Sequence, residues 1–255
     1  MPGLTTSPVL SVHGLTKRYG DRVVLAGFDL EVDGGEVVSI LGANGSGKST
    51  SLRCISGLTR FDDGIVRVAG REVRSGEHVP EIAMVFQKIH LVPQLSALEN
   101  VCAGALGRLS FRQAWMPRAF PADVREEAMG CLDRVGLASR VHDRAGRLSG
   151  GQQQRVAVAR ALCQRAEVLL ADEPVSALDP AAAEQVMRLL RSLADDDGMA
   201  VATVLHQPDL ARRHCDRVVG LTDGRITVAA SSSAVTDADV DALYAADYAA
   251  EGALA

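Results

Sequence analysis

The sequence predicts an α/β fold in which buried strands of one sheet end in loops that carry polar side chains. Three short, mainly apolar runs support this prediction, at residues 37–41, 168–171 and 200–205. Each run ends at a polar or glycine-rich segment, as buried strands of a parallel sheet do. Because the carboxyl ends of parallel strands meet at one edge of the sheet, we expect the residues that follow these runs to lie close together.

The first run leads into a glycine-rich loop that fits the pattern G-x-x-x-x-G-K-[ST] without a mismatch. Apolar residues at helical spacing follow it (Leu52, Ile55 and Leu58), so the loop joins a strand to a helix, the context in which this pattern binds phosphate. Loop N–H groups and the helix N-terminus attract phosphate oxygens. Lys48 reaches the β- and γ-phosphates, and Ser49 ligates Mg²⁺. The sequence therefore predicts a P-loop nucleoside triphosphatase core that binds ATP or GTP through Gly42, Ala43, Asn44, Gly45, Ser46, Gly47, Lys48, Ser49 and Thr50.

Composition limits the partners that the chain can have. The 255 residues carry a formal net charge of −5 and only 4% aromatic residues, which argues against nucleic acid as a partner. The five cysteines lack C-x-x-C spacing, which disfavours a disulfide framework or a zinc site. No apolar run approaches the roughly 20 residues that span a bilayer. If the protein works at a membrane, another chain must supply the membrane part.

The N-terminal part predicts a lead followed by short strands. Residues 1–8 read as a flexible lead without signal-peptide character, and residues 9–12, 23–25 and 28–32 alternate as strands of an antiparallel β subdomain. Tyr19 lies between these strands, where by itself it would pack a hairpin. A further buried strand at 82–86 ends at Gln87, whose amide could contact Mg²⁺ or an attacking water.

In residues 88–147 the spacing of apolar residues changes from that of strands to that of helices, which predicts a helical insertion. Apolar residues there recur at helical spacing, while Gly104, Gly107, Pro117 and Pro121 break its first part into loop. A second glycine turn follows the insertion and opens a helix over about 153–163. Glycines before a helix N-terminus again favour an anion, and this turn consists of Leu148, Ser149, Gly150, Gly151 and Gln152.

Paired carboxylates follow the second apolar run. Asp172 lies where the second nucleotide strand of a P-loop enzyme places the aspartate that holds Mg²⁺ through water. Glu173, one residue further on, is placed to act as general base on the water that attacks the γ-phosphate. Pro180 starts a helix predicted to run through about Leu193, before a solvated turn at 195–198. The third run ends at His206, a candidate γ-phosphate sensor. A hairpin over 217–228 precedes an alanine-rich tail (231–255) that adds at most a short helix or two.

Taken together, these residues resemble the ATP-binding subunits of ABC transporters over essentially the whole chain, with one ATPase domain at 9–230. The resemblance implies that 42–50 is the phosphate loop, Gln87 the glutamine loop, 148–152 the signature, and 172–173 the second nucleotide strand with its catalytic glutamate. It also implies that residues 176–179, which include Asp179, form the D-loop, that His206 is the switch histidine, and that Tyr19 stacks on adenine. The cofactors would be ATP and Mg²⁺.

The resemblance also implies partners. Two copies would pair head to tail, so that the signature of one caps the γ-phosphate held by the other. The pair would drive integral membrane permease subunits, and indirectly a solute-binding protein, from the cytoplasmic face of the cell membrane. We expect the region from Gln94 to Trp115 to form an apolar groove for a short permease helix, lined by Leu95, Leu98, Val101 and Leu106.

Within the family, the chain is most similar to the energy-coupling subunits of phosphonate importers. Similar stretches include 107–109 with Trp115, 132–137, 148–155, 171–175, His206-Gln207 and 209–211. Ser176-Ala177, Lys88-Ile89-His90 and Pro208 depart from those subunits. Phosphite or another small oxyanion is a close substrate alternative, followed by amino acids or phosphate. An export or lipoprotein-release ATPase, a soluble ABC protein of DNA repair or translation, and a catalytically silent copy are further alternatives.

Overall fold

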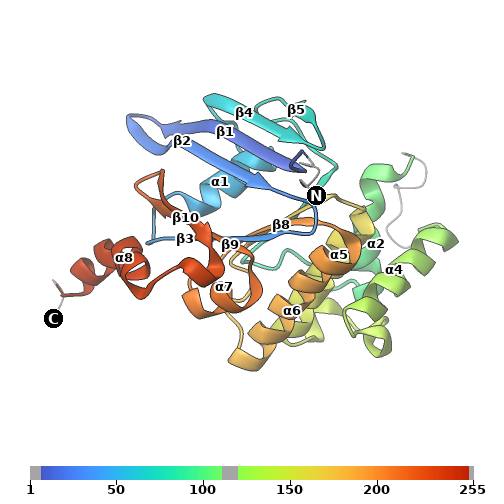
Figure 1. The fold of residues 1–255 in the computed structure, drawn as a ribbon. Coiled ribbons are helices and arrows are strands. Elements are labelled where there is room, and N and C mark those ends of the chain that lie inside the picture. Colours follow the sequence, from blue (N-terminus) through green and yellow to red (C-terminus); the bar gives the residue numbers. More distant parts are fainter. Residues whose placement is uncertain (1–6, 111–119, 253–255) are drawn as a thin grey trace, which may run out of the picture.

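The computed structural model describes residues 7–110 and 120–252 and contains a six-stranded and a four-stranded sheet (Figure 1). The larger sheet has the strand order β10-β9-β3-β8-β7-β6, and all its neighbours run parallel except β9 and β10. Its strands are β3 (Val37–Leu41), β6 (Ile82–Val85), β7 (Val168–Asp172), β8 (Ala200–Val204), β9 (Arg217–Thr222) and β10 (Arg225–Ser231). The three apolar runs are thus adjacent parallel strands, and the predicted α/β class is confirmed.

The smaller sheet is antiparallel, with the order β2-β1-β4-β5. It consists of β1 (Leu10–Tyr19), β2 (Arg22–Val32), β4 (Asp63–Val68) and β5 (Arg71–Val73). The first two strands are longer than the short runs predicted at 9–12, 23–25 and 28–32. They form one hairpin whose tight turn places Gly20 at φ 57°, a left-handed conformation that favours glycine.

Alternate residues of the central strand β3 face two separate cores. Val37 and Leu41 point into the core shared with the helices, whereas Val38 and Ile40 point toward the antiparallel sheet. Helix α1 (Lys48–Ile55) lies between the two sheets, and α5 (Gly150–Gln164), α6 (Pro180–Asp197) and α7 (Pro208–His214) cover the opposite face (Figure 1). Burial of each such aliphatic side chain contributes about 1.5–3 kcal/mol, so both faces hold the strands in register.

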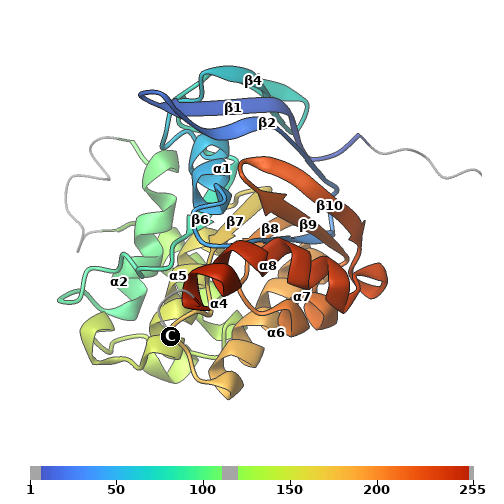
Figure 2. The same cartoon turned by 90° about the vertical axis from the view of Figure 1, so that its left-hand side faces the viewer.

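The predicted helical insertion lies at the β6 side of the parallel sheet (Figure 2). It contains α2 (Ala97–Cys102), the 3₁₀ turn η1 (Ala103–Arg108), α4 (Ala122–Arg134), η2 (Ala138–Arg140) and η3 (Ala145–Arg147). Gly104 and Gly107 lie within η1, so the loop predicted there is wrong. A Cβ on Gly104 would lie 2.1 Å from the carbonyl oxygen of Arg160, which shows that this glycine lets η1 approach α5 closely. Trp115 and Pro117 fall outside the described residues.

Three other helix boundaries differ from the predictions. Helix α1 ends at Ile55, and Leu58 lies beyond it with 59% of its surface exposed. Helix α6 continues through Asp197 to a left-handed Gly198 cap, so the predicted turn at 195–197 is helical. The tail contains η4 (Ser232–Ala234) and a 16-residue helix, α8 (Asp237–Gly252), which is longer than predicted. Leu243 of α8 is buried directly over Gly220 of β9, and this packing fixes the helix.

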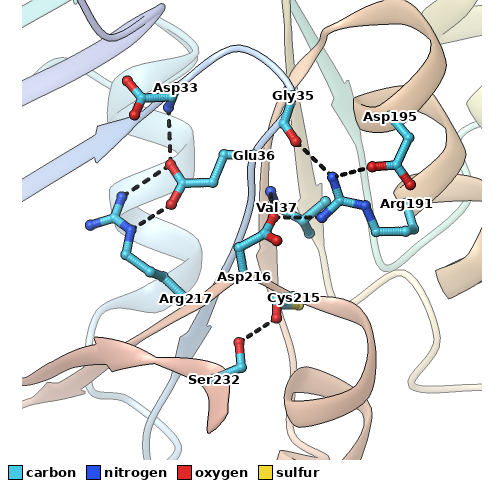
Figure 3. A network of polar contacts seen from close by, with 10 residues as sticks. All are labelled: Asp33, Gly35, Glu36, Val37, Arg191, Asp195, Cys215, Asp216, Arg217 and Ser232. Carbon is cyan, nitrogen blue, oxygen red and sulfur yellow. Dashed lines mark hydrogen bonds and ion pairs between the residues drawn. The ribbon is translucent and has the colours of Figure 1, made fainter. Parts of the chain in front are cut away.

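A network of charged side chains joins the amino ends of β3 and β9 to the end of α6 (Figure 3). Glu36 accepts hydrogen bonds from Arg217 Nε at 2.5 Å and from the backbone N–H of Asp33. Asp216 accepts from the backbone N–H of Val37 at 2.8 Å and from Arg191. The pKa of Arg217 is raised, chiefly by its hydrogen bond with Glu36, so the network favours the charged state.

No helix within 7–110 and 120–252 is both long and apolar enough to cross a bilayer.

Candidate active site

The glycine-rich loop runs from β3 to α1 and wraps the first turn of that helix. Gly42 (φ 145°) and Gly47 (φ 109°) adopt backbone conformations that other residues rarely reach. A Cβ on Gly47 would lie 2.8 Å from the carbonyl oxygen of Val24, so glycine lets the loop pass under the β1–β2 hairpin. The loop ends at Gly47, the N-cap of α1, and a helix N-terminus favours an anion.

Two buried polar groups of the loop are suited to phosphate. Lys48 is only 5% exposed, and its Nζ donates to the carbonyl oxygens of Gly42 at 2.7 Å and Ala43 at 2.9 Å. The buried hydroxyl of Ser46 has no hydrogen-bond partner in the described part of the chain. A buried hydroxyl without a partner costs free energy, and a phosphate oxygen at the loop would satisfy it.

Asp172 and Ser49 form the oxygen pair that the sequence predicts for Mg²⁺. Ser49 Oγ donates to Asp172 Oδ1 at 2.7 Å, across the space between α1 and β7. Burial raises the pKa of Asp172, and the hydrogen bond from Ser49 opposes that rise. No cluster of three or more His, Cys, Asp or Glu side chains suited to a metal occurs in the described ranges. Mg²⁺ fits such a site because it takes few protein oxygens and keeps waters and nucleotide oxygens as its other ligands.

Glu173 lies at the centre of a second group of side chains, drawn from three strand ends. Gln87 Nε2 donates to Glu173 Oε2 at 2.6 Å, and His206 Nε2 lies 2.6 Å from Glu173 Oε1. Glu173 itself has a φ of 50°, an uncommon conformation for a residue with a side chain, which costs of order 1–3 kcal/mol. The two acids are adjacent in sequence but contact different partners, Ser49 for Asp172 and Gln87 with His206 for Glu173.

A cavity of about 330 Å³ opens between the loop and the β1–β2 hairpin. Tyr19 is 54% exposed at its edge, and Lys17 Nζ lies 4.9 Å from the centre of the Tyr19 ring. The ring is thus oriented by a cation–π contact on one face, which leaves the other for a ligand. The residues that line the cavity are Tyr19, Arg22, Val24, Asn44, Gly45, Gly47, Lys48, Ser49, Thr50 and Glu173.

Arg22 and Val24 are lining residues that the sequence analysis missed. A single arginine and a single valine carry no motif, and only the pairing of β2 with β1 places them beside Tyr19.

The signature and Asp179 lie outside this cavity. Ser149 and Gln152 form a capping box at the start of α5, in which each side chain accepts a backbone N–H of the other. Asp179 caps α6 by accepting the N–H groups of Ala181 and Ala182. A Cβ on Gly151 would lie 3.1 Å from the Ala182 methyl, so the signature and the start of α6 are neighbours. Within one chain these residues form a second anion-attracting helix end, separate from the loop at α1.

The site and fold agree with a match to a known family. Residues 25–176 match the family model described as ABC transporter. The chain therefore belongs to the ABC transporter family, and the predicted resemblance is confirmed.

The phosphonates import ATP-binding protein PhnC of Frankia casuarinae is 49% identical over 222 residues, which cover 85% of this chain and 87% of that protein. PhnC 2 of Pseudomonas savastanoi pv. phaseolicola is 43% identical over 93% of this chain and 90% of that protein. The hypophosphite import ATP-binding protein HtxD of Stutzerimonas stutzeri is 41% identical over 92% of this chain and 70% of that protein.

Solved structures of ATP-binding cassettes share the fold. The dimeric post-hydrolysis state of the cassette MJ0796, bound to ADP and Pi, superposes with a TM-score of 0.74 at 32% identity and covers 89% of this chain and 100% of that one. The ADP conformation of the cassette MJ1267 has a TM-score of 0.79 at 25% identity and covers 89% of this chain and 92% of that one. The chain is thus an ATPase of this family with the predicted antiparallel and helical parts.

Proposed function

We propose that this chain is the ATP-hydrolysing subunit of an importer for phosphonates. The observation that carries the proposal is the 49% identity to a phosphonates import ATP-binding protein over 85% of the chain. A second candidate, import of a smaller phosphorus oxyanion, is favoured by the 41% identity to a hypophosphite import ATP-binding protein.

Within this function we assign the site residues to roles. Tyr19 stacks on adenine, and the loop with Lys48 holds the phosphates. Ser49, Asp172 and Gln87 would hold Mg²⁺, which when bound would neutralise charge on the β- and γ-phosphates. Glu173 takes a proton from the attacking water, and His206 orients the γ-phosphate. The contacts of Glu173 with Gln87 and His206 support this grouping, because they join the three residues at one edge of the sheet.

We further propose that two copies complete the site head to tail. The signature and Asp179 do not line the loop cavity of their own chain. Their exposed helix ends, at α5 and α6, can instead face the γ-phosphate held by a second copy. The dimeric form of the related cassette MJ0796 supports this arrangement.

A groove beside Gln87 is suited to contact with a membrane subunit. A chain that docks there would work at the cytoplasmic face of the membrane. The groove has a volume of about 340 Å³ and lies between β6, η1 and α5. Its lining includes Leu58, Met84, Phe86, Gly104 and Arg108. We propose that it receives a short permease helix and that Phe86 passes the motion to its neighbour Gln87. A solute-binding protein would contact the permease and not this chain.

The residues expected in the insertion to contact a permease, Leu95, Leu98, Val101 and Leu106, do not line the groove beside Gln87. Leu98 lines a separate cavity with Ser96, Cys102 and Phe120, and a permease contact at these residues stays a prediction. Leu98 and Val101 are buried in the core of the insertion. Leu95 is half-buried and Leu106 is 41% exposed, and neither lines the groove.

Substitution of Leu58 by Asp tests the docking surface. It places a charge on an exposed groove residue, so uptake should fall while the ATPase activity of the purified chain stays unchanged. Met129→Asp is the matched control, because Met129 is an exposed methionine (44%) of α4 outside the groove. Uptake that survives Leu58→Asp as well as it survives Met129→Asp would contradict this use of the groove.

Growth tests the substrate. Cells that lack the gene should fail to grow on a phosphonate as sole phosphorus source, and the intact gene should restore growth while Glu173→Gln should not. Growth that depends on the gene with hypophosphite and not with phosphonate would favour the second candidate. Growth on both sources without the gene would contradict the proposal.

A further inference from the structure

We propose that Arg22 binds the phosphate chain of the nucleotide, as a positive charge supplied by the β1–β2 hairpin. The inference rests on the proposed nucleotide site and adds a residue that no sequence motif marks. It assigns to the hairpin a second task besides carrying Tyr19.

The pairing of the hairpin strands points Arg22 into the site. Tyr19 and Arg22 are direct cross-strand partners, so their side chains project from the same face of the hairpin. Both residues line the loop cavity. A Cβ built on Gly45 would lie 3.9 Å from Nη2 of Arg22, which places the guanidinium of this exposed side chain beside the phosphate loop.

Backbone hydrogen bonds fix the hairpin against the loop. Ala26 of β2 donates its N–H to Gly224 O at 2.9 Å, and Gly224 donates its N–H to Ser46 O at 3.0 Å. Gly47 approaches Val24 closely enough that a Cβ would collide with its carbonyl oxygen. The position of Arg22 relative to the loop is therefore set by the fold before a nucleotide binds, which lowers the entropy cost of the contact.

The charge of Arg22 is not used by another group. In residues 7–110 and 120–252 no carboxylate lies within ion-pair distance of it, whereas Arg191 and Arg217 at the other end of the sheet each pair with acids. A guanidinium recognises phosphate through a planar set of donors, which matches the anion that the loop is built to hold.

Nucleotide affinity tests the proposal with a matched pair of variants. Arg22→Gln removes the charge and keeps most of the side-chain length. Arg18→Gln makes the same change on the same hairpin, at an exposed residue that does not line the cavity. Lys48→Ala reports on the loop itself. The probes are fluorescent derivatives of AMP, ADP and ATP, titrated into each purified chain at low and physiological salt.

We expect Arg22→Gln to weaken ATP binding about tenfold, as a charge-assisted hydrogen bond at a partly exposed site does. The loss should grow from AMP to ADP to ATP and should shrink as salt rises. Arg18→Gln should stay within about twofold of the unchanged chain. Affinities of Arg22→Gln that match those of Arg18→Gln, or that fall equally for all three nucleotides, would overturn the proposal. If Lys48→Ala also kept full affinity, the proposed nucleotide site itself would be wrong.

Discussion

The amino and carboxyl ends of the parallel strands carry the same kinds of residue but different partners. At the amino ends, Glu36 pairs with Arg217 and Asp216 pairs with Arg191 (Figure 3). At the carboxyl ends, Asp172 accepts from a serine hydroxyl, and Glu173 contacts a glutamine amide and a histidine. The acids at the amino ends thus form ion pairs with guanidinium groups, and the acids at the carboxyl ends do not.

The pKa directions agree with this difference. The hydrogen bond that Arg217 donates to Glu36 raises the pKa of Arg217 and favours its charge, whereas burial raises the pKa of Asp172 and disfavours the charge of that carboxyl. Removing one partner of a matched pair leaves an uncompensated charge, whereas the buried Asp172 carboxyl feels Arg53 and Lys48 only through space and is still penalised for its charge. The carboxyl-end edge is therefore built for ligands and the amino-end edge for stability.

The largest expected effect is on catalysis at the carboxyl-end edge. Glu173→Gln removes the proposed general base, so ATP turnover should fall by about 10²–10⁴-fold while ATP still binds. Steady-state phosphate release and equilibrium ATP binding are the measurements. Glu36→Gln serves as the control, with turnover per folded molecule unchanged. Normal turnover by Glu173→Gln would contradict the assignment of the base.

The next effect is on stability at the amino-end edge. Glu36→Gln keeps the shape of the side chain but leaves Arg217 without its carboxylate, so the free energy of unfolding should fall by about 1–3 kcal/mol. For a chain of this size each kcal/mol lowers the melting temperature by about 2–4 °C. Thermal unfolding followed by circular dichroism checks this. A melting temperature equal to that of the unchanged chain would show that the network adds no stability.

The smallest expected effect is a gain in the free energy of unfolding, from a substitution at Asp172. Because the pKa of Asp172 is raised above its ordinary value of 3.8 in the folded chain, its charge lowers stability at neutral pH. Asp172→Asn without nucleotide should therefore be slightly more stable than the unchanged chain at pH 7. The advantage should shrink as pH falls through the raised pKa toward 3.8.

Urea unfolding from pH 7.5 down to 4.5 measures this difference, and the same titration with MgATP should show that Asp172→Asn has lost the stabilisation by ligand. If Asp172→Asn destabilised the nucleotide-free chain as Glu36→Gln does, the two edges would not differ as described.

Those parts of the site that lie in contiguous motifs at strand ends could be predicted from the sequence. The loop at 42–50, Asp172-Glu173 and His206 follow buried strands, and the parallel sheet brings them together as expected. The place of Arg22 in the site could not be predicted, because only the pairing of two strands makes it a neighbour of the loop.

Helix lengths and exposure were less predictable because tertiary packing decides them. Asp195–Asp197 read as a turn, yet Arg191 pairs with Asp195 one helical turn away and Gly198 provides the cap. Helix α8 depends on the packing of Leu243 over Gly220, which no local pattern shows. Leu58 fits the helical spacing after the phosphate loop but lies beyond the end of α1 and is 59% exposed, and Leu98, expected in a docking groove, is buried in the insertion.

Sedimentation of the Glu173→Gln chain tests most directly whether the carboxyl-end edge is half of an ATP site that a second copy completes. We predict a monomer without nucleotide or with MgADP, and a dimer with MgATP. Adding Gly150→Asp places a carboxylate in the signature, where its Cβ meets only Leu178 at 3.5 Å, so folding should tolerate it. That double variant should bind MgATP and remain a monomer. A Glu173→Gln chain that binds MgATP and stays monomeric, or a dimer that Gly150→Asp leaves intact, would contradict the account.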